Sequence, residues 1–194
     1  MRFTPGSIDG LWVIDIEPKV DHRGFFARSW SRDEFADHGL TADWAQSNLQ
    51  VSPQAGTMRG LHYQLPPFGE DKLVRCTRGA AFDVSVDLRP DSPTYRSWFG
   101  VELTGESHRS VWSPKGCAHG YVTLVPDTEV FYLTSHEYYP AAVAGIKYDD
   151  PAFAIEWPRP IEMVPADYDT WPLYDEGQAE RWGQPISAAP GGGR

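Results

Sequence analysis

Short runs of strand-forming residues, separated by turn-forming residues, constrain the fold of this chain more than any other feature of its sequence. The runs are residues 11–17, 24–30, 44–51, 57–64, 72–78, 80–88, 97–103, 109–113, 117–125 and 128–135. Turn formers rich in Pro, Gly, Asp and Ser lie between them, for example at residues 89–93 and 104–107. Many short strands joined by such turns are typical of sandwiches and barrels, so we expect an all-β fold.

One short helix is expected after the second run. Ser31 and Glu34 have the spacing of a capping box, and Gly39 stands where such a helix would end. A chain of 194 residues suits one domain with a sizeable core. We therefore expect a single domain over residues 1–184, followed by a disordered tail over residues 185–194.

Composition excludes several classes of function. A net charge of −10 argues against general attraction to nucleic acid or to anionic lipid. No apolar stretch approaches the ~20 residues of a membrane span, and the first residues lack the apolar core of a signal peptide. Cys76 and Cys117 fall within predicted strands, without metal-ligand spacing. We expect them to be buried free thiols of a cytoplasmic protein.

Polar side chains recur at every second position of several predicted strands. The sets are Gln46, Asn48 and Gln50; Asp83, Ser85 and Asp87; and Cys117, His119 and Tyr121. Because alternate side chains point to the same face of a strand, one sheet face is lined with chemical groups. The simplest interpretation is a barrel whose interior is a reaction chamber. Alternation fails between Arg59 and His62, which share a face only if Gly60 hosts a β-bulge.

Three residue types in these strands suit proton transfer. His62 has the chemistry of a general base, since imidazole titrates near pH ~6.5. Taken singly, His62 fits an ordinary strand histidine, Lys72 an exposed strand-edge lysine and Tyr132 a packing residue. Their combination with amides and Arg59 favours a catalytic site.

Motifs in order along the chain resemble those of one enzyme family. They are Asp21-His22-Arg23-Gly24-Phe25-Phe26, Gln46-Ser47-Asn48, residues 59–64, 72–76, 82–89, 92–94 and 118–120, Tyr132 with Tyr138, Asp150-Pro151 and Trp157-Pro158. From Asp21 to Pro172 the chain resembles the dTDP-4-dehydrorhamnose 3,5-epimerases. The resemblance implies a cupin-type double-stranded β-helix, a jelly-roll barrel with short flanking helices. It also implies a homodimer.

The resemblance also implies a role for each matching residue. His62 would be the base, Lys72 would stabilise an enolate, and Tyr132 would return a proton from the opposite face. A late aspartate, Asp167 or alternatively Asp169, would pair with His62. The residues expected to contact substrate are Arg23, Phe26, Arg28, Gln46, Asn48, Arg59, His119 and Tyr138, with Asp83 supporting them from behind. Arg23 and Arg59 would hold the diphosphate, and Tyr138 would stack on the nucleotide base.

The implied reaction is epimerisation at C3 and C5 of a nucleotide-linked 4-keto-6-deoxyhexose, most simply a dTDP sugar, in deoxysugar synthesis. Both hydrogens are acidified by the C4 carbonyl, so the chemistry requires no metal and no organic cofactor. Metal-loaded cupins need a His-x-His pair, whereas Gln64 follows His62 here and Glu70 lies in a Pro/Gly loop. Single-centre epimerisation, a CDP-sugar substrate and a barrel that only binds nucleotide sugars or glycans are the alternatives.

Arg28 departs from the family, whose members carry a glutamate after the Gly-Phe-Phe run. Thymine N3 is a hydrogen-bond donor and suits a carboxylate, whereas cytosine N3 is an acceptor and suits a guanidinium. Arg28 therefore either indicates a cytidine nucleotide or is an exposed residue that makes no base contact.

Overall fold

The computed structural model describes residues 1–40, 43–166, 171, 173 and 174. Its strands are β1 (Arg2–Pro5), β2 (Trp12–Asp15), β3 (Lys19–Asp21), β4 (Gly24–Phe26), β5 (Gln46–Ser52), β6 (Met58–Gln64), β7 (Lys72–Arg78), β8 (Ala80–Asp87), β9 (Trp98–Thr104), β10 (Ser110–Ser113), β11 (Cys117–Thr123), β12 (Thr128–Thr134) and β13 (Val143–Gly145). The helices are α1 (Arg32–Ala36) and the short 3₁₀ helix η1 (Pro140–Ala142). The predicted all-β class is confirmed.

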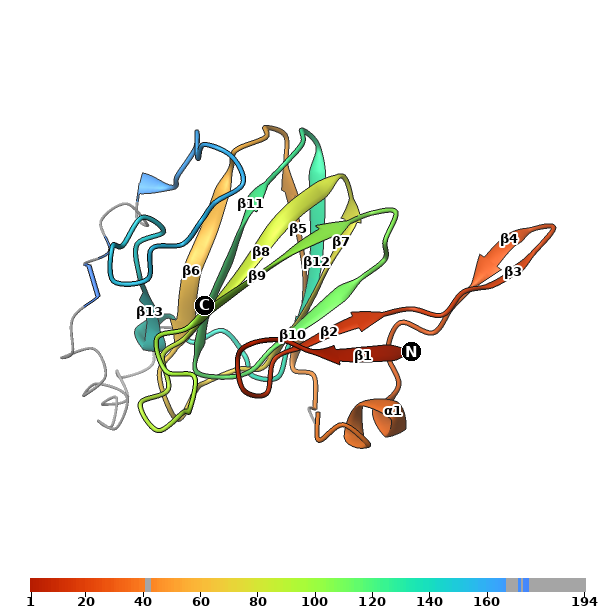
Figure 1. Ribbon diagram of the computed structural model, residues 1–194, viewed down its shortest axis with the longest axis horizontal. Helices are drawn as coiled ribbons and strands as arrows, with labels where there is room; N and C mark the ends of the chain where they lie inside the picture. The colour runs from red at the N-terminus through yellow and green to blue at the C-terminus, as the bar shows by residue number, and fades with distance from the viewer. Residues whose placement is uncertain (41–42, 167–170, 172, 175–194) are drawn as a thin grey trace, which may run out of the picture.

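Two sheets face each other and form the barrel (Figure 1). One has the order β1-β2-β10-β7-β12-β5, and the other has the order β13-β6-β11-β8-β9. Antiparallel pairing joins each neighbouring pair of these strands, including β12 with β5 and β11 with β6. The expected jelly-roll barrel of the cupin type is confirmed, with short helices at its flanks.

Alternation along each strand separates the interior of the barrel from its outer faces. On β7, Val74 and Cys76 belong to an apolar cluster between the sheets, whereas Leu73 packs outward against the cluster that holds Phe35 of α1. On β8, Val84 and Val86 pack outward beneath the C-terminal segment. The opposite face of β8 carries Asp83, Ser85 and Asp87, as the period-two pattern predicted.

The interior of the barrel has an apolar part and a polar part. The apolar part is a buried cluster of residues from both sheets: Ile8, Leu11, Val74, Cys76, Ala81, Leu103, Val111, Cys117, Tyr121 and Val130. Cys76 and Cys117 are buried free thiols there, as predicted. Polar side chains at other inward positions line the pocket described below. Within the described ranges, no helix is long and apolar enough to cross a membrane.

A β-bulge at Gly60 brings Arg59 and His62 to the same side of the sheet, as the sequence required. His119 of β11 pairs with His62, and Tyr121 pairs with Arg59, so two residues of β6 stand opposite one residue of β11. Gly60 has a φ of +94°, and a Cβ there would lie 2.4 Å from the carbonyl oxygen of His119. A glycine is therefore needed at this position.

Several local predictions were wrong. The predicted capping box is absent, because Ser31 makes no side-chain cap and Glu34 binds the amino group of Met1 at 2.9 Å instead. The run over residues 24–30 forms a strand only at Gly24–Phe26. Strands β1, β3 and β13 were not predicted, since their few residues carry no alternating pattern.

The hairpin of β3 and β4 projects away from the barrel (Figure 1). It exposes Val20, Phe25 and Phe26, and the exposed fraction of Phe26 is 67%. The outer face of the edge strand β5 also exposes two apolar side chains, Leu49 and Val51. The chain thus presents two apolar surfaces that its own fold leaves open.

Candidate active site

A pocket opens between the two sheets. Its outer part is lined by Gln46, Asn48, His62, Gln64, Glu70, Lys72, Tyr132, Thr134, His136, Tyr138 and Val143. Its inner part is lined by Gln50, Arg59, His62, Lys72, His119, Gly120, Tyr121 and Tyr132. His62, Lys72 and Tyr132 border both parts, so the residues singled out for proton transfer meet at one place.

His62 enters the pocket from β6 and is adapted to act as a neutral base. The surrounding protein removes water from its imidazole, and Lys72 and His119 add positive charge nearby. These effects hold the pKa of His62 well below its ordinary value of 6.5. The imidazole is therefore unprotonated at neutral pH, which is the form that accepts a proton.

Lys72 stands at the start of β7, and its side chain is buried. Its ammonium lies 3.3 Å from a carboxylate oxygen of Glu70 and donates to the backbone carbonyl of His62, also at 3.3 Å. A buried positive charge is thus held beside His62.

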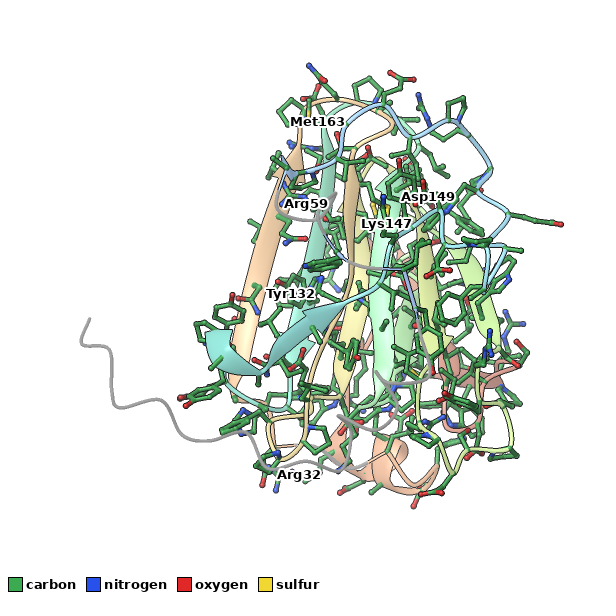
Figure 2. All side chains as sticks on the ribbon, turned by 90° about the vertical axis from the view of Figure 1, so that its left-hand side faces the viewer. Arg32, Arg59, Tyr132, Lys147, Asp149 and Met163 are labelled. Atoms are coloured by element: carbon green, nitrogen blue, oxygen red, sulfur yellow. The ribbon has the colours of Figure 1, made fainter. Side chains whose placement is uncertain are left out.

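Tyr132 faces His62 from the other sheet. It lies on β12, between the inward residues Val130 and Thr134, whereas His62 lies on β6. Figure 2 shows Tyr132 near the middle of the barrel and Arg59 nearer the end that holds Met163. A group bound between the sheets would therefore have an imidazole on one side and a phenol on the other.

His119 and Asp83 form a buried pair beside this site. The Nε2 of His119 donates to an Asp83 carboxylate oxygen at 2.8 Å, and both side chains are almost completely enclosed. Arg59 is held by Ser52 at 3.2 Å. The inner part of the pocket therefore offers a guanidinium and a fixed imidazole to a polar ligand.

The rim of the pocket carries predicted substrate contacts. Gln46 and Asn48 point inward from β5, and the side chain of Gln46 accepts a hydrogen bond from the backbone N–H of Tyr138 at 3.0 Å. Tyr138 itself is exposed at the mouth, where its ring is available for stacking.

Arg23, Phe26 and Arg28 do not join these residues within the chain. Arg23 sits at the tip of the β3–β4 hairpin and binds Asp21 at 2.6 Å. Phe26 and Arg28 border a separate hollow with Glu34, whose carboxylate lies 3.8 Å from the Arg28 guanidinium. Asp167 and Asp169 lie outside the described residues. Among the residues that are described, no group of three or more His, Cys, Asp or Glu could hold a metal ion.

Several residues of the pocket were not identified as site residues from the sequence, among them the polar residues Gln64, Glu70, Thr134 and His136 of its outer part. Gln64 and Thr134 had a signal, since each continues an alternating set that also holds His62 or Tyr132. Glu70 and His136 lie in loops, where no periodicity reports the direction of a side chain.

Comparison with known proteins agrees with this geometry. The family model for dTDP-4-dehydrorhamnose 3,5-epimerase matches residues 5–175. A dTDP-4-dehydrorhamnose 3,5-epimerase from Sinorhizobium fredii is 46% identical over 88% of this chain and 87% of its own length. A dTDP-4-dehydrorhamnose 3-epimerase from Streptomyces niveus is 41% identical over 87% of this chain and 82% of its own.

A solved structure with bound ligands is similar throughout. The dTDP-4-dehydrorhamnose 3,5-epimerase of Bacillus anthracis, crystallised with TDP and PPi, superposes with a TM-score of 0.86 and 35% identity. The match covers 89% of this chain and 99% of that one. Fold, pocket and sequence lead to one conclusion: the chain belongs to the dTDP-4-dehydrorhamnose 3,5-epimerase family.

Proposed function

We propose that this enzyme epimerises C3 and C5 of a dTDP-linked 4-keto-6-deoxyhexose by proton abstraction and return. Membership of the family makes the chain an isomerase of nucleotide-sugar metabolism. The observation that carries the proposal is that His62 and Tyr132 enter one pocket from facing sheets. Lys72 lines the same pocket, and its ammonium contacts the backbone carbonyl of His62. Inversion of a carbon centre requires a proton acceptor on one face of the carbon and a proton donor on the opposite face.

The chemistry assigns each of the three residues a role. His62, unprotonated at neutral pH, removes the hydrogen next to the C4 carbonyl. Negative charge then gathers on the C4 oxygen, and the ammonium of Lys72 stabilises it. One well-placed donor of this kind contributes about 3–4 kcal/mol. Tyr132 returns a proton from the opposite side, so the centre is inverted.

The rest of the pocket suits the nucleotide diphosphate. Arg59 offers hydrogen-bond donors to phosphate oxygens, and the exposed ring of Tyr138 offers a stacking surface to a base. The TDP and PPi bound in the Bacillus anthracis relative support a nucleotide ligand.

Solvent deuterium exchange tests this function. The enzyme is incubated in D₂O with dTDP-4-keto-6-deoxyglucose, and the sugar is followed by NMR. Label at C3 and C5 is expected. Label at C3 alone would instead make the enzyme a single-centre epimerase, an alternative that the Streptomyces niveus relative favours. Absence of any exchange would leave only a nucleotide-sugar-binding barrel.

We also propose that the active species is a homodimer in which each β3–β4 hairpin completes the pocket of the other subunit. The resemblance assigns Arg23 and Phe26 to substrate, yet the hairpin carries them away from the pocket of their own chain. Phe25 and Phe26 on the hairpin, with Leu49 and Val51 on β5, leave apolar surface open for a partner. A second copy with twofold symmetry would cover both surfaces.

Mixed dimers test whether the hairpin acts on the partner. One variant carries His62→Ala, and the other carries Arg23→Ala with Phe26→Ala. Each is expected to be inactive alone. After mixing and subunit exchange, half of the dimers are hybrids with one intact pocket, so about a quarter of the wild-type activity should return. No recovery despite confirmed exchange would place the hairpin's role within its own chain.

A further inference from the structure

A buried carboxylate accompanies the ammonium of Lys72 inside the pocket. Glu70 comes from the loop before β7, and only 7% of its side chain is exposed. Its Oε1 lies 3.3 Å from the Lys72 ammonium, whose side chain is 5% exposed. Burial of a carboxylate is costly unless its oxygens are hydrogen-bonded or paired with a charge. Glu70 therefore needs a partner for each of its two carboxylate oxygens.

The second oxygen of Glu70 is also bound, and the group that binds it is itself held. The side-chain amide of Gln64 donates to Oε2 of Glu70 and to the backbone carbonyl of Phe68, the latter at 2.9 Å. The Oε1 of Gln64 accepts the backbone N–H of Tyr139 at 2.5 Å. Because a backbone N–H can only donate, this contact fixes which end of the amide faces Glu70.

Lys72 is consequently held at two points. Its ammonium contacts Glu70 and donates to the carbonyl of His62 at 3.3 Å. An ammonium has three N–H donors, so these contacts leave one for an oxygen bound in the pocket. A lysine side chain without such partners would sample many rotamers, and its charge would not be aimed at one point.

We infer that Glu70 is the positioning residue for Lys72: its carboxylate holds the ammonium directed at the carbonyl oxygen of the substrate. The inference rests on the proposed function, because that function gives Lys72 its task. Glu70 need not touch the substrate, and it acts through Lys72.

Among the described residues, Glu70 is the carboxylate that contacts Lys72. His62 from β6, His119 from β11 and Tyr132 from β12 face the same pocket, and Cys117 lies further along β11. None of these four side chains is a carboxylate. The other described carboxylates nearby are engaged elsewhere: Asp83 accepts from His119, and Asp71 accepts from Ser135 and from the backbone of Lys115.

Glu70→Gln removes the charge and keeps the size of the side chain. We expect kcat to fall about tenfold or more with little change in KM, because the ground-state contacts of the nucleotide lie elsewhere. Glu70→Asp, which keeps the charge but shortens the side chain, should recover part of the lost kcat.

Glu137→Gln is the matched control. Glu137 lies in the loop after β12 near the same mouth, and its side chain is exposed. Its neutralisation removes the same charge from the protein but does not touch Lys72. Its kcat and KM should therefore stay at wild-type values.

Lysine-selective NMR gives a readout that is independent of turnover. The chain has four lysines, Lys19, Lys72, Lys115 and Lys147, so ¹⁵N,¹³C-lysine labelling yields few signals. The Lys72 side-chain signal should move from its wild-type chemical shift in Glu70→Gln, and Glu137→Gln should leave it unchanged. A wild-type Lys72 signal together with a wild-type kcat in Glu70→Gln would overturn the inference. Absence of deuterium exchange in the wild type would instead overturn the proposed function.

Discussion

Gly60→Ala should lower both the stability and the activity of the enzyme. The loss of folding free energy can be worked out from the backbone angle and the neighbours of the residue. A side chain in the left-handed region costs about 1–2 kcal/mol, and Gly60 has a φ of +94°. A Cβ there would also lie 2.4 Å from the carbonyl oxygen of His119 and 2.7 Å from the Cα of Gly120. Both are backbone atoms that cannot rotate away, so overpacking adds about 1–3 kcal/mol.

Gly39→Ala separates these two costs. Gly39 has a φ of +74°, yet nothing lies within 4 Å of a Cβ built there. This control should lose only the conformational part, about 1–2 kcal/mol, and keep full activity. The measurement is urea unfolding of both variants with the slope m compared to that of the wild type.

Catalysis should separate the two variants further. Relief of the clash at Gly60 requires β6 to move from β11, which displaces Arg59 or His62. A displacement of about 1 Å in a catalytic group can cost about 10²-fold in rate. Gly60→Ala with the stability of Gly39→Ala and wild-type kcat/KM would refute the claim that the bulge sets the site.

Four further outcomes are expected. His62→Ala should abolish turnover and deuterium exchange at C3, while calorimetry still detects TDP binding, because the diphosphate contacts are elsewhere. Tyr132→Phe should still admit deuterium on the His62 side, whereas inverted product nearly disappears from the NMR spectrum. The acid limb of kcat/KM should lie below pH 6.5, because the lowered pKa keeps His62 unprotonated until the pH falls through that value; a limb above it would contradict the assignment. If Arg28 reads the base, cytidine diphosphate should compete at least as well as thymidine diphosphate in calorimetry, and Arg28→Glu should reverse this by about tenfold or more.

The division of residues between strand faces could be predicted from the sequence where polar and apolar side chains alternate. Val84 and Val86 alternate with Asp83 and Ser85, and this pattern puts the polar set on one face of β8. The break in alternation between Arg59 and His62 pointed to Gly60 as the place where a bulge would bring them to one face, and the bulge is found there. Short elements such as β13, with three small or β-branched residues, carry too few positions to show any period.

Residues in loops could not be placed by the same reasoning. Glu70 follows Pro66, Pro67 and Gly69, and nothing in that spacing reports that its carboxylate turns back toward Lys72. The capping prediction failed because a distant group, the amino terminus, competes for Glu34. Glu70 lies in an irregular loop, and Glu34 contacts a residue that is distant in sequence. The periodicity of a strand or helix predicts neither kind of contact.

The alternation of side chains has a consequence for redesign of this enzyme. On β7, Lys72 faces the pocket, whereas the next residue, Leu73, packs against the cluster beneath α1. Adjacent residues of the strand therefore have different roles, one in the pocket and one in the outer packing. A library that varies only the pocket-lining positions of β5, β6 and β12 would explore new sugars and nucleotides. The outer clusters would stay intact in every member of that library, and the loss of folded protein that accompanies most active-site libraries should be correspondingly small.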